Sequence, residues 1–160
     1  MSFDERLQRA IQRGKRTRDT KNKEADAERM SEEDIKNLHS KYRLELSEHI
    51  ENNLKQLADQ FPGFSYQTIF GEDGWGGKIN RDDVNLGKDR SSGNLYSRFE
   101  MVIRPYSDAH IVELIGKATI RNKELFNRTH YHFLHELDEK TFRELIDLWV
   151  LDFAEQYATI

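Results

Sequence analysis

The sequence predicts an α+β fold in which long N-terminal helices precede a four- to five-stranded antiparallel meander and a C-terminal helix. Three observations support this class. Apolar residues recur every three or four positions between residues 31 and 61, alternate with polar residues between 64 and 134, and return to helical spacing after Asp138. Because short turn segments separate the alternating stretches, we expect antiparallel neighbours, with the helices packed on one face of the sheet.

The N-terminal part of the chain is highly charged. Phe3, Leu7 and Ile11 lie four residues apart, which places them on one face of a short helix. The stretch from 14 to 29 has almost no apolar residues and therefore cannot bury a face. We expect residues 1–30 to form a basic helical arm or linker, and residues 31–160 to form a single α+β domain.

A long helix is predicted to begin at Ser31, where "SEED" supplies a capping hydroxyl and three acids for the first turn. Its apolar stripe extends over eight turns to the helix-breaking "FPGF" at 61–64. The residues of the stripe are Ile35, Leu38, Tyr42, Leu46, Ile50, Leu54, Leu57 and Phe61.

Strands are predicted at 64–70, within 78–86, and at 95–104, 110–121 and 124–134. The glycine-rich stretches 71–78, which contains Trp75, and 87–94 are predicted loops. Asp138 is expected to cap a helix that ends near Tyr157. Leu148 and Leu151 widen its apolar face, which indicates packing on both the sheet and the long helix, or a dimer interface.

The register of the last hairpin follows from its apolar residues. An even turn centred on Asn122 and Lys123 puts Leu114 opposite Tyr131 on the core face. The same register puts Glu113 opposite His132 on the other face. The predicted core contains Leu38, Tyr42, Ile50, Leu54, Phe99, Met101, Leu114, Tyr131, Phe133, Leu145 and Trp149.

Three histidines lie close together in "NRTHYHFLHEL", residues 127–137. In a strand, His130 and His132 project from the same face, so they are candidate metal ligands with Glu113 as a third. The simpler interpretation makes them ordinary strand residues, with His132 hydrogen-bonded to Glu113.

A second set of candidate binding residues follows from the sheet face that the helices leave uncovered. This face is predicted to carry arginines and lysines together with apolar residues that a fully solvated face does not need, so a partner is expected there. The candidates are Arg98, Arg104, Lys117 and Arg128, with Trp75 at a loop tip; the apolar residues are Val102, Ile111, Ile115, Phe126 and Leu134.

Composition and charge narrow the possible functions. The chain has no cysteine, which excludes disulfides, thiolate zinc sites and cysteine nucleophiles. No apolar run approaches the roughly 20 residues that cross a bilayer, so we expect a cytoplasmic protein without a membrane partner. Residues 1–23 hold eight Lys/Arg and three Asp/Glu, whereas the remaining residues carry a net charge of −9.

These features favour a non-catalytic protein-binding or assembly module that binds a protein partner or a second copy, as in a homodimer. One alternative is a nucleic-acid or anion binder that uses residues 6–23. The other is a metal-dependent enzyme centred on His130, His132 and Glu113. The enzyme is the less favoured class, and the sequence predicts no cofactor.

Overall fold

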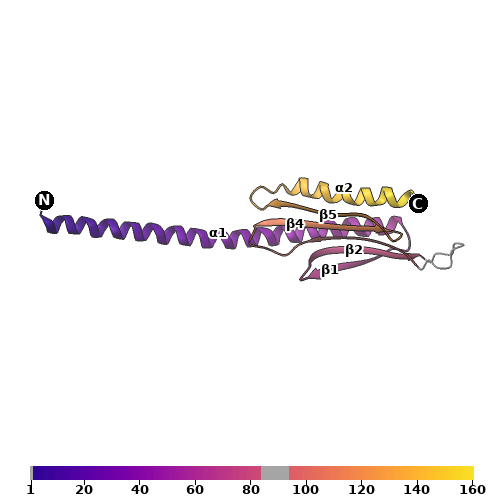
Figure 1. Ribbon diagram of the computed structural model, residues 1–160, viewed down its shortest axis with the longest axis horizontal. Coiled ribbons are helices and arrows are strands. Elements are labelled where there is room, and N and C mark those ends of the chain that lie inside the picture. The colour runs from indigo at the N-terminus through magenta and orange to yellow at the C-terminus, as the bar shows by residue number, and fades with distance from the viewer. Residues whose placement is uncertain (1, 84–93) are drawn as a thin grey trace. The chain divides into compact units, whose positions relative to one another are not determined.

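The computed structural model describes residues 2–83 and 94–160, with side chains described outside 26–30 (Figure 1). Internal contacts divide the chain into residues 1–37 and residues 38–160. The predicted loop at 87–94 lies outside the described residues except for Asn94. The elements are α1 (Phe3–Gln60), β1 (Ser65–Gly71), β2 (Gly74–Asp83), β3 (Leu95–Ile103), β4 (Ile111–Ile120), β5 (Lys123–Phe133) and α2 (Glu139–Ala158). The predicted α+β class is confirmed.

Helix α1 is continuous over 58 residues, whereas the sequence predicted a separate helix beginning at Ser31. Its charged N-terminal half is rich in Arg, Lys, Glu and Ala, which have high helix propensity, and contains no proline. Side chains of residues 2–25 are exposed, so this part of the helix is built without burying a face.

The sheet is an antiparallel meander in the order β1-β2-β3-β4-β5, so β1 and β5 form its edges. Helix α2 and residues 38–60 of α1 lie on one face of this sheet. Phe99 of β3 stacks on Phe153 of α2 at 4.9 Å between ring centroids. On the same face, Arg43 of α1 lies over the Trp75 ring of β2 at 4.1 Å.

The core lies between this face and the helices. Of the predicted core residues, Ile50, Leu54, Phe99, Met101, Leu114 and Trp149 are buried. Leu38, Tyr42 and Leu145 are partly exposed. Tyr131 and Phe133 are 54% and 42% exposed, so their assignment to the core was wrong.

The error comes from the turn between β4 and β5. The central turn residues are Arg121 and Asn122, with φ values of 46° and 70°, as in the two-residue turns that match strand twist. Asn122 tolerates this conformation, and its side chain accepts a hydrogen bond from the Tyr96 backbone N–H at 2.8 Å. A register shift then leaves Leu125 without a partner and places Leu114 opposite His130.

Trp75 lies within strand β2, so its predicted position at a loop tip was wrong. The connection between β1 and β2 is only Glu72 and Asp73. Gly77 leaves room in the strand for the Tyr66 side chain, because a Cβ at this position would lie 2.6 Å from the Tyr66 hydroxyl oxygen. Dense glycine in this stretch therefore marks close packing across the sheet face, and not a long loop.

Candidate functional site

His130 and His132 face the helices. Their ring centroids are 4.7 Å apart, and Phe142 of α2 lies 5.5 Å from the first and 5.7 Å from the second. Burial lowers the pKa of His130, and the neighbouring His132 lowers it further. The pair therefore packs as aromatic rings beside the core and favours the neutral form of His130.

Glu113 lies on the opposite face of the sheet. It pairs in register with Tyr131, so its predicted position opposite His132 was wrong. Its carboxylate lies 3.8 Å from the Arg104 guanidinium. The structure thus does not bring Glu113 to the two histidines, and the described residues contain no group of three or more potential ligands placed to hold a metal ion. Metal binding by the histidines alone stays a prediction.

The five candidate binding residues do not form one surface. Arg98, Arg104 and Lys117 lie on the uncovered side of the sheet, and Arg98 forms an ion pair with Glu100. Arg128 is on the helix-covered side, where it contacts Asp152 of α2 at 3.2 Å and lies over the Phe126 ring. Trp75 is on that covered side as well, beneath Arg43.

The uncovered face is partly apolar, as predicted, and carries three of the five predicted apolar residues. Val102 is buried, and Ile111 and Ile115 are half-buried. Phe126 was predicted to lie there but packs 6.1 Å from Trp149 of α2 on the helix-covered side. Leu134, also predicted there, directly follows β5 and is buried. Because of the register shift in β5, the uncovered face carries the exposed rings of Tyr131 and Phe133, and Phe126 lies on the other face.

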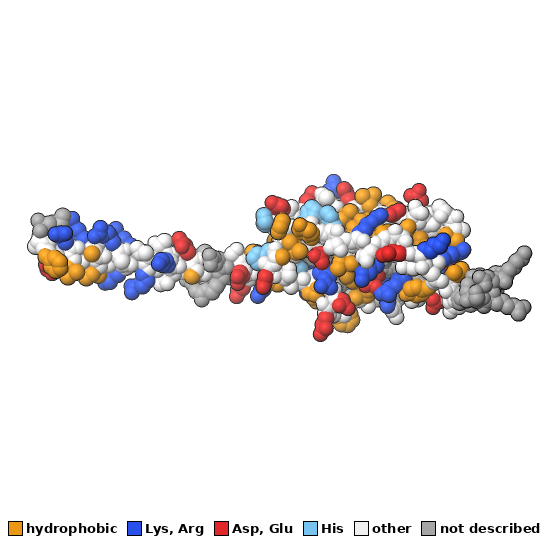
Figure 2. All heavy atoms as spheres, in the orientation of Figure 1, with side chains coloured by type: hydrophobic (Ala, Val, Ile, Leu, Met, Phe, Trp, Pro, Cys, Tyr) orange, Lys and Arg blue, Asp and Glu red, His pale blue; other side chains and the backbone are white. Residues whose placement is uncertain are grey.

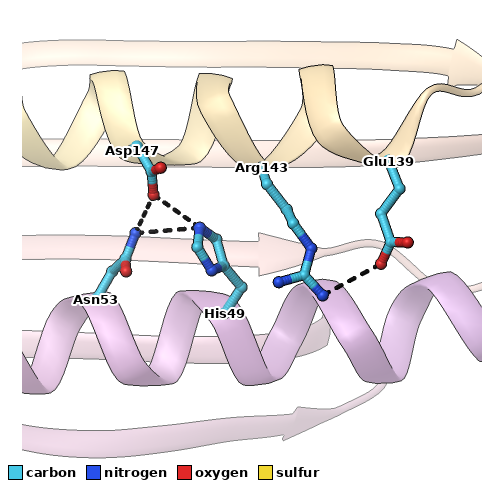
Figure 3. Close-up of polar contacts among 5 residues, drawn as sticks. All are labelled: His49, Asn53, Glu139, Arg143 and Asp147. Atoms are coloured by element: carbon cyan, nitrogen blue, oxygen red, sulfur yellow. Dashed lines mark hydrogen bonds and ion pairs between the residues drawn. The ribbon is translucent and has the colours of Figure 1, made fainter.

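A groove of ≈600 Å³ lies between the C-terminal part of α1 and the middle of α2. Figure 3 shows three of its polar lining residues, His49 and Asn53 from α1 and Asp147 from α2. Its lining combines apolar side chains with amides and one His–Asp pair. The lining residues are His49, Asn53, Gln56, Leu57, Gln60, Asp147, Val150, Leu151 and Ala154.

Three polar side chains link the helices at the groove (Figure 3). His49 Nε2 and Asp147 Oδ1 are 2.7 Å apart, with the histidine on α1 and the aspartate on α2. Asn53 Nδ2, one turn beyond His49, donates to the same Asp147 oxygen at 2.6 Å. The His49 side chain is 19% exposed and that of Asp147 is 47% exposed, so the carboxylate remains accessible from outside.

A second polar contact lies further along the same helices. Arg143 pairs with Glu139 at 3.3 Å within α2 (Figure 3). A hydrogen bond with the Glu139 carboxyl raises the pKa of Glu45 on α1, and the same bond lowers the pKa of Glu139. Arg143 also stabilises the charged form of Glu139. Glu45 of α1 and Glu139 of α2 therefore form a second polar contact between the helices.

Two leucines of α2 remain exposed beside the groove. Leu148 is 60% exposed and Leu151 is 62% exposed, although packing on both the sheet and α1 was predicted to cover them. Glu144 and Glu155, exposed residues of the same helix, are four positions from Leu148 and from Leu151 respectively. Residues spaced by four are neighbours on a helix, so each exposed leucine has an exposed glutamate beside it.

The His49–Asp147 pair is the one titratable pair that lines the groove among the described residues. Among the described residues that line the groove, none carries a hydroxyl or thiol that the His49–Asp147 pair could activate. The sequence reading missed His49, Asn53 and Asp147. Their signal was polar residues directly beside apolar stripe positions, but that pattern does not tell which helices meet.

The fold is an α+β domain with a groove between its two helices. Comparisons with protein-family models, curated proteins and solved structures found no match for the chain. Within the described part of the chain, no helix combines the length and apolar character needed to cross a bilayer.

Proposed function

We propose that residues 38–160 form a non-catalytic protein-binding module and that the groove between α1 and α2 is its docking surface. The observation that carries this proposal is the exposure of Leu151, which lines the partly apolar groove, and of Leu148, three positions before it on α2. Full burial of a leucine side chain is worth roughly 1.5–3 kcal/mol. A partner that covers both leucines therefore gains a substantial apolar contact.

The chemistry of the surface favours a basic amphipathic helix as the partner. Asp147 presents a half-exposed carboxylate inside the groove, and Glu144 and Glu155 flank the leucines. Residues 24–160 carry a net charge of −9. Lys and Arg on the partner would meet these acids, while its apolar residues, spaced by three and four, would enter the groove.

Several expectations from the sequence belong with this proposal. Self-association, including a homodimer, is the case in which a second copy covers Leu148 and Leu151. A nucleic acid remains the alternative partner for residues 6–23, and the cytoplasm remains the expected place of action. The metal-dependent enzyme remains the least supported class, since Glu113 lies apart from His130 and His132.

The test is an NMR titration of the full chain with an 18-residue helical peptide of leucine and lysine. We expect shifts at the Leu148 and Leu151 methyl groups and at the Asn53 amide, with no binding of the glutamate analogue of the peptide. Leu148→Asp with Leu151→Asp should reduce affinity at least tenfold. The matched control is Leu44→Asp, which changes a 57% exposed leucine that does not line the groove.

Two results would contradict the proposal. One is that peptide binding moves resonances elsewhere in the domain and leaves the groove unchanged. The other is equal affinity for the wild type and for the variant with both leucines replaced. Sedimentation velocity of the free protein identifies the remaining case: a dimer that dissociates when both leucines are replaced makes the second copy the partner.

A further inference from the structure

The first turns of α1 expose an apolar face. Phe3, Leu7 and Ile11 are 76%, 43% and 45% exposed, and their spacing of four places them in one row along the helix. Gly14 continues the row, and a Cβ there would meet nothing within 4 Å. Among the described residues of the 1–37 unit, none covers this row, which has the chemistry of a contact surface.

An arginine row lies along another side of the same turns. Arg6, Arg9, Arg13 and Arg16, with Gln12, line a shallow hollow of ≈390 Å³. Among the described residues, no carboxylate forms an ion pair with any of these four arginines. Figure 2 shows Lys and Arg side chains along one side of this segment and hydrophobic side chains along another.

We propose that residues 3–16 bind the surface of an anionic lipid bilayer, with the helix lying in the plane of the interface. Such helices combine an apolar face that enters the headgroup boundary with a polar face rich in Lys and Arg. Fourteen residues form a helix about 21 Å long, and the row of four arginines along it would contact the phosphate groups of the headgroups. Each basic residue near such a surface strengthens binding about fivefold.

The apolar row favours lipid over nucleic acid. A nucleic-acid backbone would neutralise the arginines but would leave Phe3, Leu7 and Ile11 in water. A bilayer interface accommodates both rows together. The expectation of no membrane partner rested on the lack of a spanning segment, and surface attachment does not need one.

The test is sedimentation of the full chain with vesicles of neutral phosphatidylcholine, or of phosphatidylcholine with about one-third phosphatidylserine. We expect binding to the anionic vesicles, at least tenfold weaker binding to the neutral ones, and a decrease with added salt because the surface charge is screened. A Phe3→Trp variant should show a blue shift of the added tryptophan on binding.

Two pairs of variants separate the rows. Arg6→Gln with Arg13→Gln should weaken binding about 25-fold, from two fivefold steps. Lys123→Gln with Lys140→Gln makes the same change in charge at two exposed residues outside the proposed binding segment, and should have a much smaller effect. Leu7→Gln with Ile11→Gln should weaken binding and remove the blue shift.

Three outcomes would overturn the proposal. The first is equal binding to neutral and anionic vesicles, or no binding to either. The second is anionic binding that Leu7→Gln with Ile11→Gln leaves unchanged. The third is binding of a 20-nucleotide RNA or DNA probe that requires Arg6 and Arg13, without vesicle binding, which would assign the arginine row to nucleic acid.

Discussion

Two histidines, His39 and His130, have surroundings that disfavour their protonated forms. His39 is 2% exposed, and its Nε2 has no hydrogen-bond partner among the described residues. Burial lowers its pKa, and the positive charge of Arg43 lowers it further. His130 is affected in the same direction by burial and by His132. Both residues therefore link stability to pH with the same sign.

Replacing His39 with leucine should remove part of that dependence. In the unfolded chain a histidine titrates near its ordinary value of 6.5, whereas the folded pKa is lower. Below pH 6.5 the unfolded state binds more protons, so the stability present above that pH is lost as pH falls through the folded pKa. His39→Leu should flatten this loss. At pH 8 it should change the free energy of unfolding by less than about 1 kcal/mol, because the removal of the unpaired Nε2 and the loss of the hydrogen bond with the Arg104 backbone act in opposite directions.

Urea unfolding at pH 5, 6, 7 and 8 measures both effects of His39→Leu. The matched control is His135→Gln, because the His135 side chain is 71% exposed. An unchanged pH slope in His39→Leu would show that other groups cause the acid sensitivity.

At the level of the elements, the register of the β4–β5 hairpin is set by its turn and not by the pairing of apolar residues across the strands. Asn122 adopts φ 70°, and its side chain bonds the Tyr96 N–H and the Asn94 carbonyl at 2.8 and 3.1 Å. The sequence predicted the strands but placed the turn one residue late, because apolar alternation does not report on left-handed turn residues. The placement of His130 against the helices follows from this turn and the Leu125 bulge.

Two substitutions at Asn122 separate its roles. Asn122→Gly keeps the turn conformation and removes both side-chain hydrogen bonds, which should cost about 1–2 kcal/mol. Asn122→Ala removes the bonds and also strains the turn, so it should cost at least about 1 kcal/mol more. Chemical denaturation gives both values, and equal losses would show that the conformation of Asn122 contributes little.

At the level of the whole molecule, the sequence predicted the order of the elements and most of the core, but not the groove between the helices. The order of elements and most core residues follow from the spacing of apolar residues, because the apolar side of each helix or strand is buried in the core. The groove depends on which side of α1 contacts which side of α2. The spacing of apolar residues in the sequence does not give that information. Leu148 and Leu151 were visible as an excess of apolar residues on α2, yet only the structure shows that they stay exposed.

Deletion of residues 1–30 should leave the stability of the remaining domain nearly unchanged. The described side chains of residues 2–25 are all exposed, so their loss removes little buried apolar area and should change the free energy of unfolding by less than about 1 kcal/mol. The comparison variant is Ile50→Ala in the full chain: Ile50 is fully buried, and its truncation should cost about 2–5 kcal/mol.

Thermal and urea unfolding, followed by circular dichroism, measure both proteins. We expect the deletion to remove helical signal in proportion to the residues lost, without moving the unfolding midpoint. A loss of stability as large as that of Ile50→Ala would show that residues 38–160 depend on the deleted segment. That segment would then have a structural role, and vesicle binding by residues 3–16 would have to compete with it.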